Sequence, residues 1–160
     1  MRMAKIIKPD SNQSYDLEPT VFLAGSIEMG AAEDWQKKVE KALARLPVVI
    51  FNPRRDDWDS SWEQSITNPE FNHQVNWEMD HLEDADFVFF YFAPDTKSPI
   101  SLLELGLQSG SGYRRLVICC PDGFWRKGNV DIVCKREGWE VFTDLDEAID
   151  ELVKRMMQRL

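Results

Sequence analysis

The chain has 160 residues, of which 43% are hydrophobic and 29% are charged, and its formal net charge at pH 7 is −9. This length and composition predict one globular domain, residues 1–160, with a core of its own. The excess of acidic residues argues against nucleic acid or an anionic membrane as a partner, because both favour a basic surface. A small-molecule ligand remains open.

Strands and helices alternate along the predicted domain. Short runs of β-branched and aromatic residues predict strands, and apolar residues at helical spacing predict helices. In chain order these elements are a strand at 20–25, a helix at 35–46, a strand at 48–52, a long polar loop at 54–70, a helix at 71–82, a strand at 86–92, a helix at 98–109, strands at 115–120 and 139–144, and a helix at 145–156. Residues 1–18 are expected to be an extended N-terminal segment.

Continuous apolar strands separated by amphipathic helices indicate a parallel sheet that is covered on both faces. We predict an α/β fold, a small Rossmann-like (flavodoxin-like) doubly wound sheet of about five strands with flanking helices. Such sheets bind ligands beyond the carboxyl ends of their strands. Here the first two of these ends carry Gly25–Ser26 and Pro53–Asp57, and Trp58 follows in the longest loop. The phosphate-binding pattern G-x-x-x-x-G-K-[ST] is absent, so a triphosphate-binding enzyme is not expected.

The cysteines and histidines give no sign of a metal site. Cys119, Cys120 and Cys134 contain no C-x-x-C spacing and cannot pair completely, so disulfides are not expected. His73 and His81 lie eight residues apart on one predicted helix, which is too far for joint metal ligation. We expect no metal and no cofactor. Since we find neither a signal-peptide pattern nor a membrane-length apolar run, a cytoplasmic protein that does not bind membranes is expected.

One carboxylate stands in an apolar run, because Glu104 lies between Leu103 and Leu105 in "SPISLLELG". Ser101 and Glu104 fit the S-x-x-E capping box, in which Glu104 would only close the first turn of its helix. Ser98-Pro99 instead favours a helix that begins three residues earlier, which places Glu104 in the second turn. A carboxylate held there can attack an anomeric carbon, and a nearby helix N-terminus would help to keep it ionised.

The segments "FLAGSI", "NWEMDHLEDADFVFF" and "SPISLLELG", in this order and at these separations, resemble the nucleoside 2-deoxyribosyltransferase-like family. The family includes the transferases, the 2′-deoxynucleoside 5′-phosphate N-hydrolases and the CMP N-glycosidases. The resemblance covers roughly Val21 to Val133 and implies a small doubly wound α/β fold. It also implies a homo-oligomer, because relatives complete their sites across subunits.

The resemblance implies roles for individual residues. Glu104 matches the catalytic nucleophile, and Glu78 matches an acid, usually Asp, that supports protonation of the leaving base. The other residues expected at the substrate are Gly25 and Ser26 in the strand-end turn, Asn52, Pro53, Arg54, Asp57 and Trp58 in the following loop, Ser98, and Asn129. For Asn129 a plain turn at Gly128-Asn129 is an equal alternative. For Ser98 the alternative is a simple helix N-cap.

Some positions depart from the family pattern. Phe22 stands where many relatives have a tyrosine that bonds the catalytic carboxylate. Ser98 matches the nucleotide hydrolases, in which serine contacts the 5′-phosphate, and Arg54 and Arg55 would suit a phosphate too. Glu28 would repel that phosphate. We therefore expect an enzyme that cleaves the N-glycosidic bond of a nucleoside and passes the sugar to a free nucleobase. The alternatives are an N-glycosidase acting on nucleoside monophosphates and a non-catalytic nucleoside-sensing module.

Overall fold

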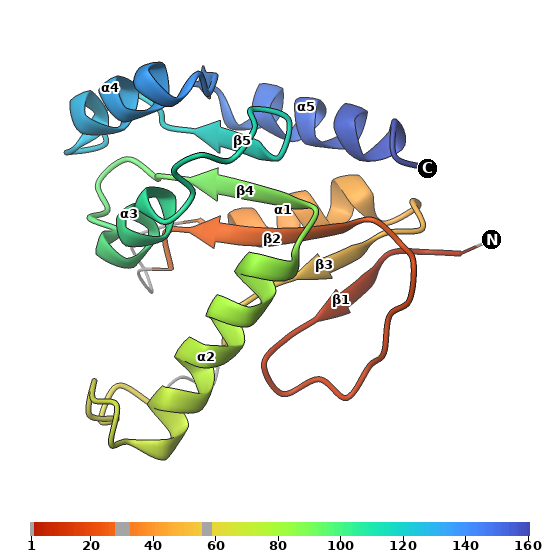
Figure 1. The fold of residues 1–160 in the computed structure, drawn as a ribbon, viewed down its shortest axis with the longest axis vertical. Helices are drawn as coiled ribbons and strands as arrows, with labels where there is room; N and C mark the ends of the chain where they lie inside the picture. Colours follow the sequence, from red (N-terminus) through yellow and green to blue (C-terminus); the bar gives the residue numbers. More distant parts are fainter. Residues whose placement is uncertain (1, 28–32, 56–58) are drawn as a thin grey trace.

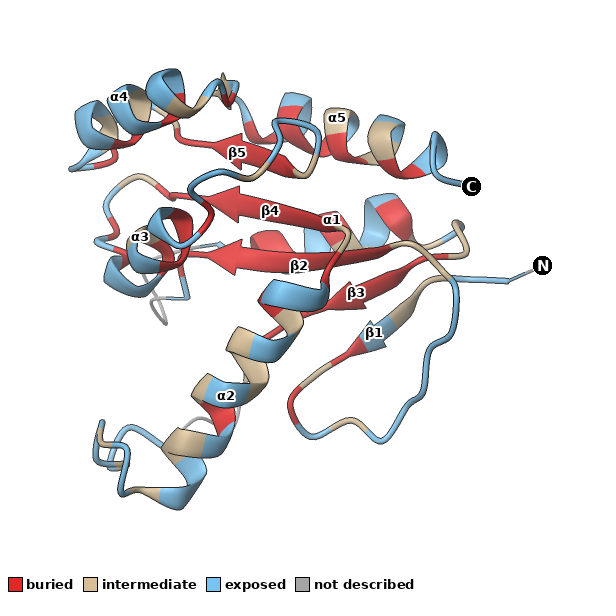
Figure 2. Cartoon of the chain, viewed as in Figure 1, coloured by how far each residue is buried: buried red, intermediate tan, exposed pale blue. Residues whose placement is uncertain are grey.

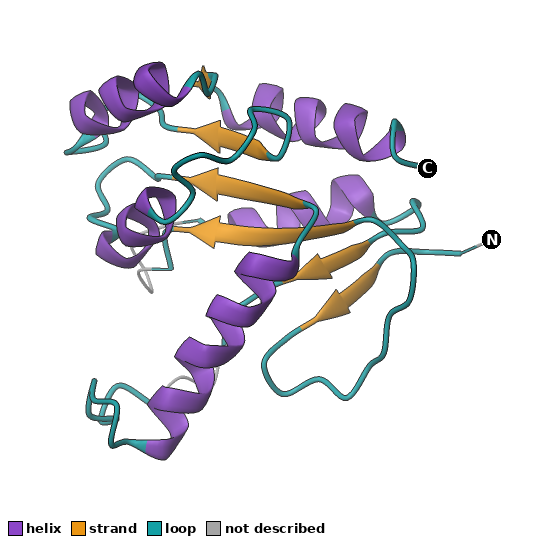
Figure 3. Ribbon diagram, viewed as in Figure 1, coloured by secondary structure: helices purple, strands orange, loops and turns teal. Residues whose placement is uncertain are grey.

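The computed structural model describes residues 2–27, 33–55 and 59–160, and these form an α/β fold with one parallel sheet between two layers of helices (Figure 1, Figure 3). The strands are β1 (Lys5–Ile7), β2 (Thr20–Gly25), β3 (Val49–Phe51), β4 (Phe87–Tyr91), β5 (Leu116–Cys119) and β6 (Val141–Phe142). The helices are α1 (Trp35–Leu43), α2 (Pro69–Asp84), α3 (Pro99–Gly106), α4 (Lys127–Glu137) and α5 (Leu145–Met157). None of the helices within these ranges is long and apolar enough to cross a membrane.

The strand order is β1-β3-β2-β4-β5-β6, and every pair is parallel. Without the edge strand β1, this is the flavodoxin-like order 2-1-3-4-5. The order reverses between β2 and β4, whose register pairs Gly25 with Tyr91 at their carboxyl ends. The predicted doubly wound fold class is therefore confirmed, and the reversal defines the place where such folds bind ligands.

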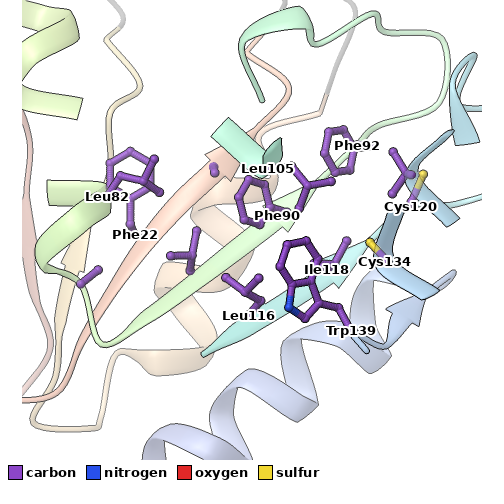
Figure 4. Packing of buried hydrophobic residues seen from close by; sticks show 14 of the residues in the cluster. Phe22, Leu82, Phe90, Phe92, Leu105, Leu116, Ile118, Cys120, Cys134 and Trp139 are labelled. Atoms are coloured by element: carbon purple, nitrogen blue, oxygen red, sulfur yellow. The ribbon is translucent and has the colours of Figure 1, made fainter. Parts of the chain in front are cut away.

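Alternate side chains of the strands enter two separate cores. On one face, Phe22 and Phe90 pack beneath α2, α3 and α4 in the cluster that Figure 4 draws in part. On the other face, Leu23 and Phe89 pack against α1 and α5. Figure 2 shows the result as an almost completely buried central sheet. Burying each large apolar side chain stabilises the fold by about 1.5–3 kcal/mol, so these two cores fix the helices that carry the polar residues described below.

Two elements differ from the expectation. The strand β1 was not predicted, because only two consecutive isoleucines mark it and its pairing with β3 is a tertiary event. The helix α4 was not predicted either, because Val130 and Cys134 are its only buried residues and its apolar face is correspondingly narrow. The alternative interpretation of Gly128-Asn129 as a plain turn is wrong, since both residues lie inside α4.

Candidate active site

Glu104 is buried in the second turn of α3. The helix begins at Pro99 with Ser98 at its N-cap position, as Ser98-Pro99 predicted. The capping-box interpretation is therefore wrong, because Ser101 lies inside the helix and is itself buried. Glu104 remains only 5% exposed, an unusual position for a carboxylate without a positive partner.

The surroundings of Glu104 favour its protonated form. Burial raises the pKa of Glu104 to about 8, and the negative charge of Glu78 contributes in the same direction. Among the described residues, no side chain donates a hydrogen bond to the Glu104 carboxylate. The raised pKa of Glu104 runs against the expectation that the helix N-terminus keeps this group ionised, because desolvation acts in the opposite direction to the helix dipole. Phe22 is fully buried, and the centroid of its ring lies 6.4 Å from that of Trp77.

Glu78 reaches the same region from α2. Its side chain is half-buried, and burial raises its pKa while a hydrogen bond from Gln74 opposes that change. The Gln74 amide donates to Glu78 Oε1 at 2.9 Å and to the Pro53 carbonyl at 3.3 Å. Gln74 thereby links α2 to the loop after β3. Gln74 was not among the predicted site residues, although its i, i+4 spacing to Glu78 was a usable signal.

Three buried hydroxyl groups meet at the reversal between β2 and β4. The Ser26 hydroxyl lies 2.7 Å from that of Thr96 and also bonds the Ser98 hydroxyl. It accepts from the Ala93 amide at 3.0 Å, and Thr96 donates to the Ala93 carbonyl at 2.8 Å. Ser98 adopts a left-handed backbone with φ of 46° and makes no side-chain cap bond. Ser98 thus occupies the predicted N-cap position, but its hydroxyl bonds the buried cluster and not the first turn of the helix. Thr96 is a further polar residue of this cluster that no sequence pattern indicated.

Gly25 is required by packing at the same strand end. A Cβ there would lie 2.6 Å from Trp35 Cζ2 and closer still to the Tyr91 carbonyl oxygen. The Trp35 indole also donates to the Ser26 carbonyl at 2.9 Å. These contacts fix the turn that brings Ser26 under the carboxyl end of β4.

Asn52 and Arg54 face the α1 side of the sheet. Asn52 is buried, and its amide donates to Glu40 at 2.6 Å. The Arg54 guanidinium donates to Gln36 at 3.1 Å and lies 3.5 Å from Asp34. The helix α1 packs on the opposite face of the sheet from α2 and α3. These two side chains thus contact α1 and its N-cap residue Asp34, whereas the Pro53 carbonyl between them bonds Gln74 of α2.

Asn129 is the remaining predicted residue that the structure describes. Asn129 is exposed on α4 and lines a groove of about 340 Å³ between α3 and α4 together with Leu102 and Leu105. Asp57, Trp58 and Glu28 lie outside the described residues, so their expected roles stay predictions.

The described geometry brings Glu104 and Glu78 together, and the cluster of buried hydroxyl groups lies at the N-terminus of the helix that carries Glu104. A search of curated proteins found no match to this chain. Comparison with protein families matches residues 18–124, about two thirds of the chain, to the family described as "nucleoside 2-deoxyribosyltransferase like". The chain therefore belongs to the nucleoside 2-deoxyribosyltransferase-like family.

Proposed function

We propose that this protein cleaves the N-glycosidic bond of nucleosides through a covalent glycosyl-enzyme on Glu104 and transfers the sugar to a second nucleobase. One observation carries the proposal: two carboxylates with raised pKa, Glu104 on α3 and Glu78 on α2, interact beside the reversal of the sheet. Desolvated titratable groups in such places are commonly catalytic. The family match supports the same class of reaction.

The two carboxylates have different roles in the proposed reaction. Repulsion between them favours a state in which the pair holds one proton, so one group can act as an acid while the other is ionised. In the first step the shared proton passes from Glu104 to Glu78, and the ionised Glu104 oxygen bonds the anomeric carbon while the bond from that carbon to the base nitrogen breaks. The electron pair of that bond passes to the base, which takes the proton held by Glu78. The positive charge that develops on the sugar stabilises the Glu104 carboxylate at this moment.

The second step reverses the first with a different base. A nitrogen of the incoming base attacks the anomeric carbon, and the bond to Glu104 breaks with its electron pair returning to the carboxylate. The proton of the incoming base returns to Glu78, and the pair again holds one proton. If water attacks instead of a base, the free sugar is released and the protein acts as a hydrolase.

The charge around the site favours an unphosphorylated sugar. Arg54, a candidate phosphate ligand, is paired with Asp34 on the α1 side of the sheet. Two nearby carboxylates would repel a phosphate, and the chain as a whole carries a charge of −9. The buried hydroxyl groups of Ser26, Thr96 and Ser98 suit neutral hydrogen-bonding partners. We therefore propose that deoxynucleosides are better substrates than nucleoside monophosphates.

The proposal is tested by incubating the protein with a deoxynucleoside and a second base, followed by chromatography. A new deoxynucleoside supports the transferase, and its absence from the Glu104→Gln variant supports the assigned nucleophile. Free base without exchange would indicate a hydrolase, and a parallel incubation with nucleoside monophosphates identifies the nucleotide N-glycosidase. Thermal stabilisation by nucleosides without any product would overturn the enzymatic proposal in favour of a sensing module.

We further propose that the protein is a homo-oligomer assembled through α3 and α4. Ile100 and Leu103 on α3 and Leu107 at its C-cap, which follow helical spacing, are 57%, 61% and 58% exposed. They adjoin the groove in which Asn129 lies, and an exposed apolar patch of this kind commonly marks an interface. A self-complementary contact would bury these residues in both copies. The particle mass measured by light scattering should exceed that of one chain, and Leu103→Lys should reduce it. A monomeric wild-type protein would contradict the assembly.

A further inference from the structure

We propose that Arg115 is a positioning residue that sets the separation between Glu78 and Glu104 by binding the carboxyl-terminal ends of the two helices that carry them. The inference rests on the proposed function, because it assigns Arg115 a role in aligning the same two carboxylates. Arg115 lies at the start of the β5 segment, far along the chain from α2, and nothing in the family pattern described above involves it.

The first set of contacts holds α2. Arg115 Nη2 donates to the Leu82 carbonyl at 2.6 Å and to the Glu83 carbonyl at 3.4 Å, and Nε donates to the Ala85 carbonyl at 3.2 Å. These are carbonyl groups at the carboxyl-terminal end of α2, which have no partners within the helix. A cation at this end also interacts favourably with the helix dipole. Leu82 lies one turn after Glu78, so the guanidinium holds the end of α2 next to that carboxylate.

The second set of contacts holds α3. Arg115 Nη1 donates to the side-chain oxygen of Gln108. The amide nitrogen of Gln108 donates in turn to the main-chain carbonyl of Glu104 at 3.4 Å. This carbonyl lies at the end of α3. The main-chain N–H of Gln108 donates to the Leu105 carbonyl and not to that of Glu104, which leaves the Glu104 carbonyl to the Gln108 side chain. The buried Gln108 side chain therefore connects the guanidinium directly to the residue that we propose as nucleophile.

The arrangement requires arginine. Its planar guanidinium presents five N–H donors in fixed directions, whereas lysine has a single flexible ammonium group. Arg115 bonds carbonyl and amide oxygens and acts on Glu104 through the backbone rather than by charge. The charged side chain that acts on the Glu104 carboxylate within the described ranges is Glu78. Arg115 thus determines how close the two carboxylates lie and how much water reaches them.

The test is the pH dependence of kcat/KM for base exchange in Arg115→Met and Arg115→Lys. When the contacts that hold the two helices are lost, Glu104 becomes more exposed to water and moves away from Glu78. The pKa of Glu104 therefore falls toward the ordinary value for glutamate. The acidic limb of the profile should therefore move to lower pH while kcat falls by about 10²-fold, the usual cost of a 1 Å misplacement. Gln108→Leu removes only the connection to α3. It should shift the acidic limb in the same direction as Arg115→Met and should perturb the fold less than Arg115→Met does.

Arg155→Met provides the matched control. Arg155 also binds main-chain carbonyl groups, those of Tyr113 at 2.9 Å and Leu116 at 2.8 Å, but it ties them to α5 on the other face of the sheet. This variant should lose thermal stability and keep the position of the acidic limb. If Arg115→Met shifts the limb no more than Arg155→Met, or if folded Gln108→Leu keeps the wild-type profile, the positioning role is wrong. If Glu104→Gln still exchanges bases, the proposed function itself fails, whatever the Arg115 variants do.

Discussion

The carboxylates of Glu78 and Glu104, carried by α2 and α3, interact closely enough for the charge of Glu78 to raise the pKa of Glu104. Burial acts in the same direction on both groups. Since the charges repel, the two groups titrate as a pair, and removing either one changes the titration of the other.

The stability of the protein should fall as pH rises between about 4.5 and 8. The folded state holds a proton on Glu104 up to a pKa of about 8, whereas the unfolded chain releases it near the ordinary glutamate value of 4.5. The folded state therefore binds more protons in this window, so the free energy of unfolding decreases with pH. A pKa that differs by one between the folded and unfolded states changes this free energy by about 1.4 kcal/mol.

Glu104→Gln should remove much of that decrease and raise the melting temperature above that of the wild type at pH 8, because a neutral amide replaces a buried charge. Thermal unfolding of both proteins at pH 5 and pH 8 measures the effect. Equal pH dependence in the two proteins would show that Glu104 is not the buried titrating group.

Glu78→Gln should reduce base release by about 10²–10⁴-fold, the usual range for loss of a general acid. The loss should be small for a nucleoside whose base leaves without protonation, because only the proton donor has been removed. The acidic limb of kcat/KM should also move to lower pH, since Glu104 loses its negative neighbour. Steady-state kinetics on the two substrates checks this, and equal losses on both would contradict an acid role for Glu78.

Thr96→Val should destabilise the protein by about 1–3 kcal/mol, the cost of leaving buried polar groups unpaired. The Thr96 hydroxyl donates to the Ala93 carbonyl and contacts the Ser26 and Ser98 hydroxyl groups. Urea unfolding measures the change. Exposed Thr67→Val is the control, and an equal effect in both variants would show that the hydroxyl cluster adds little stability.

Gly25→Ala should be strongly destabilising, because the added methyl group meets the Tyr91 backbone and the Trp35 ring. Overpacking of a core costs about 1–3 kcal/mol and more where backbone must move. Gly112→Ala is the matched control, since a Cβ at Gly112 meets nothing within 4 Å. Urea unfolding should separate the two variants clearly, and a Gly25→Ala protein as stable as Gly112→Ala would contradict the packing account.

The sequence was sufficient for the parts of the fold that have strong local signals. The run Thr20–Gly25 is a strand with the predicted bounds, and Ser98-Pro99 correctly predicted where α3 begins. The strand β1 and the helix α4 were missed because their short or narrow apolar patterns become decisive only when they pack on the sheet.

The site was only partly predictable. The isolated charge of Glu104 among leucines marked it, and the structure places Glu78 beside it. The i, i+4 spacing of Gln74 and Glu78 was a local signal. The contacts of Gln74 with Pro53, of Thr96 with Ser26 and of Arg115 with Leu82 join segments that are distant in the sequence, and no local pattern indicates them. The direction of the Arg54 side chain likewise depends on Asp34 and Gln36 of the α1 region.

The most direct measurement of the central claim is the intact mass of the protein after incubation with a deoxynucleoside that carries a 2-fluoro substituent, which slows hydrolysis of a glycosyl-enzyme. The account predicts that the mass increases by one fluorinated sugar, that peptide mapping places the adduct on Glu104, and that Glu104→Gln gains no mass. An adduct on another residue, or base exchange by Glu104→Gln at the wild-type rate, would contradict it.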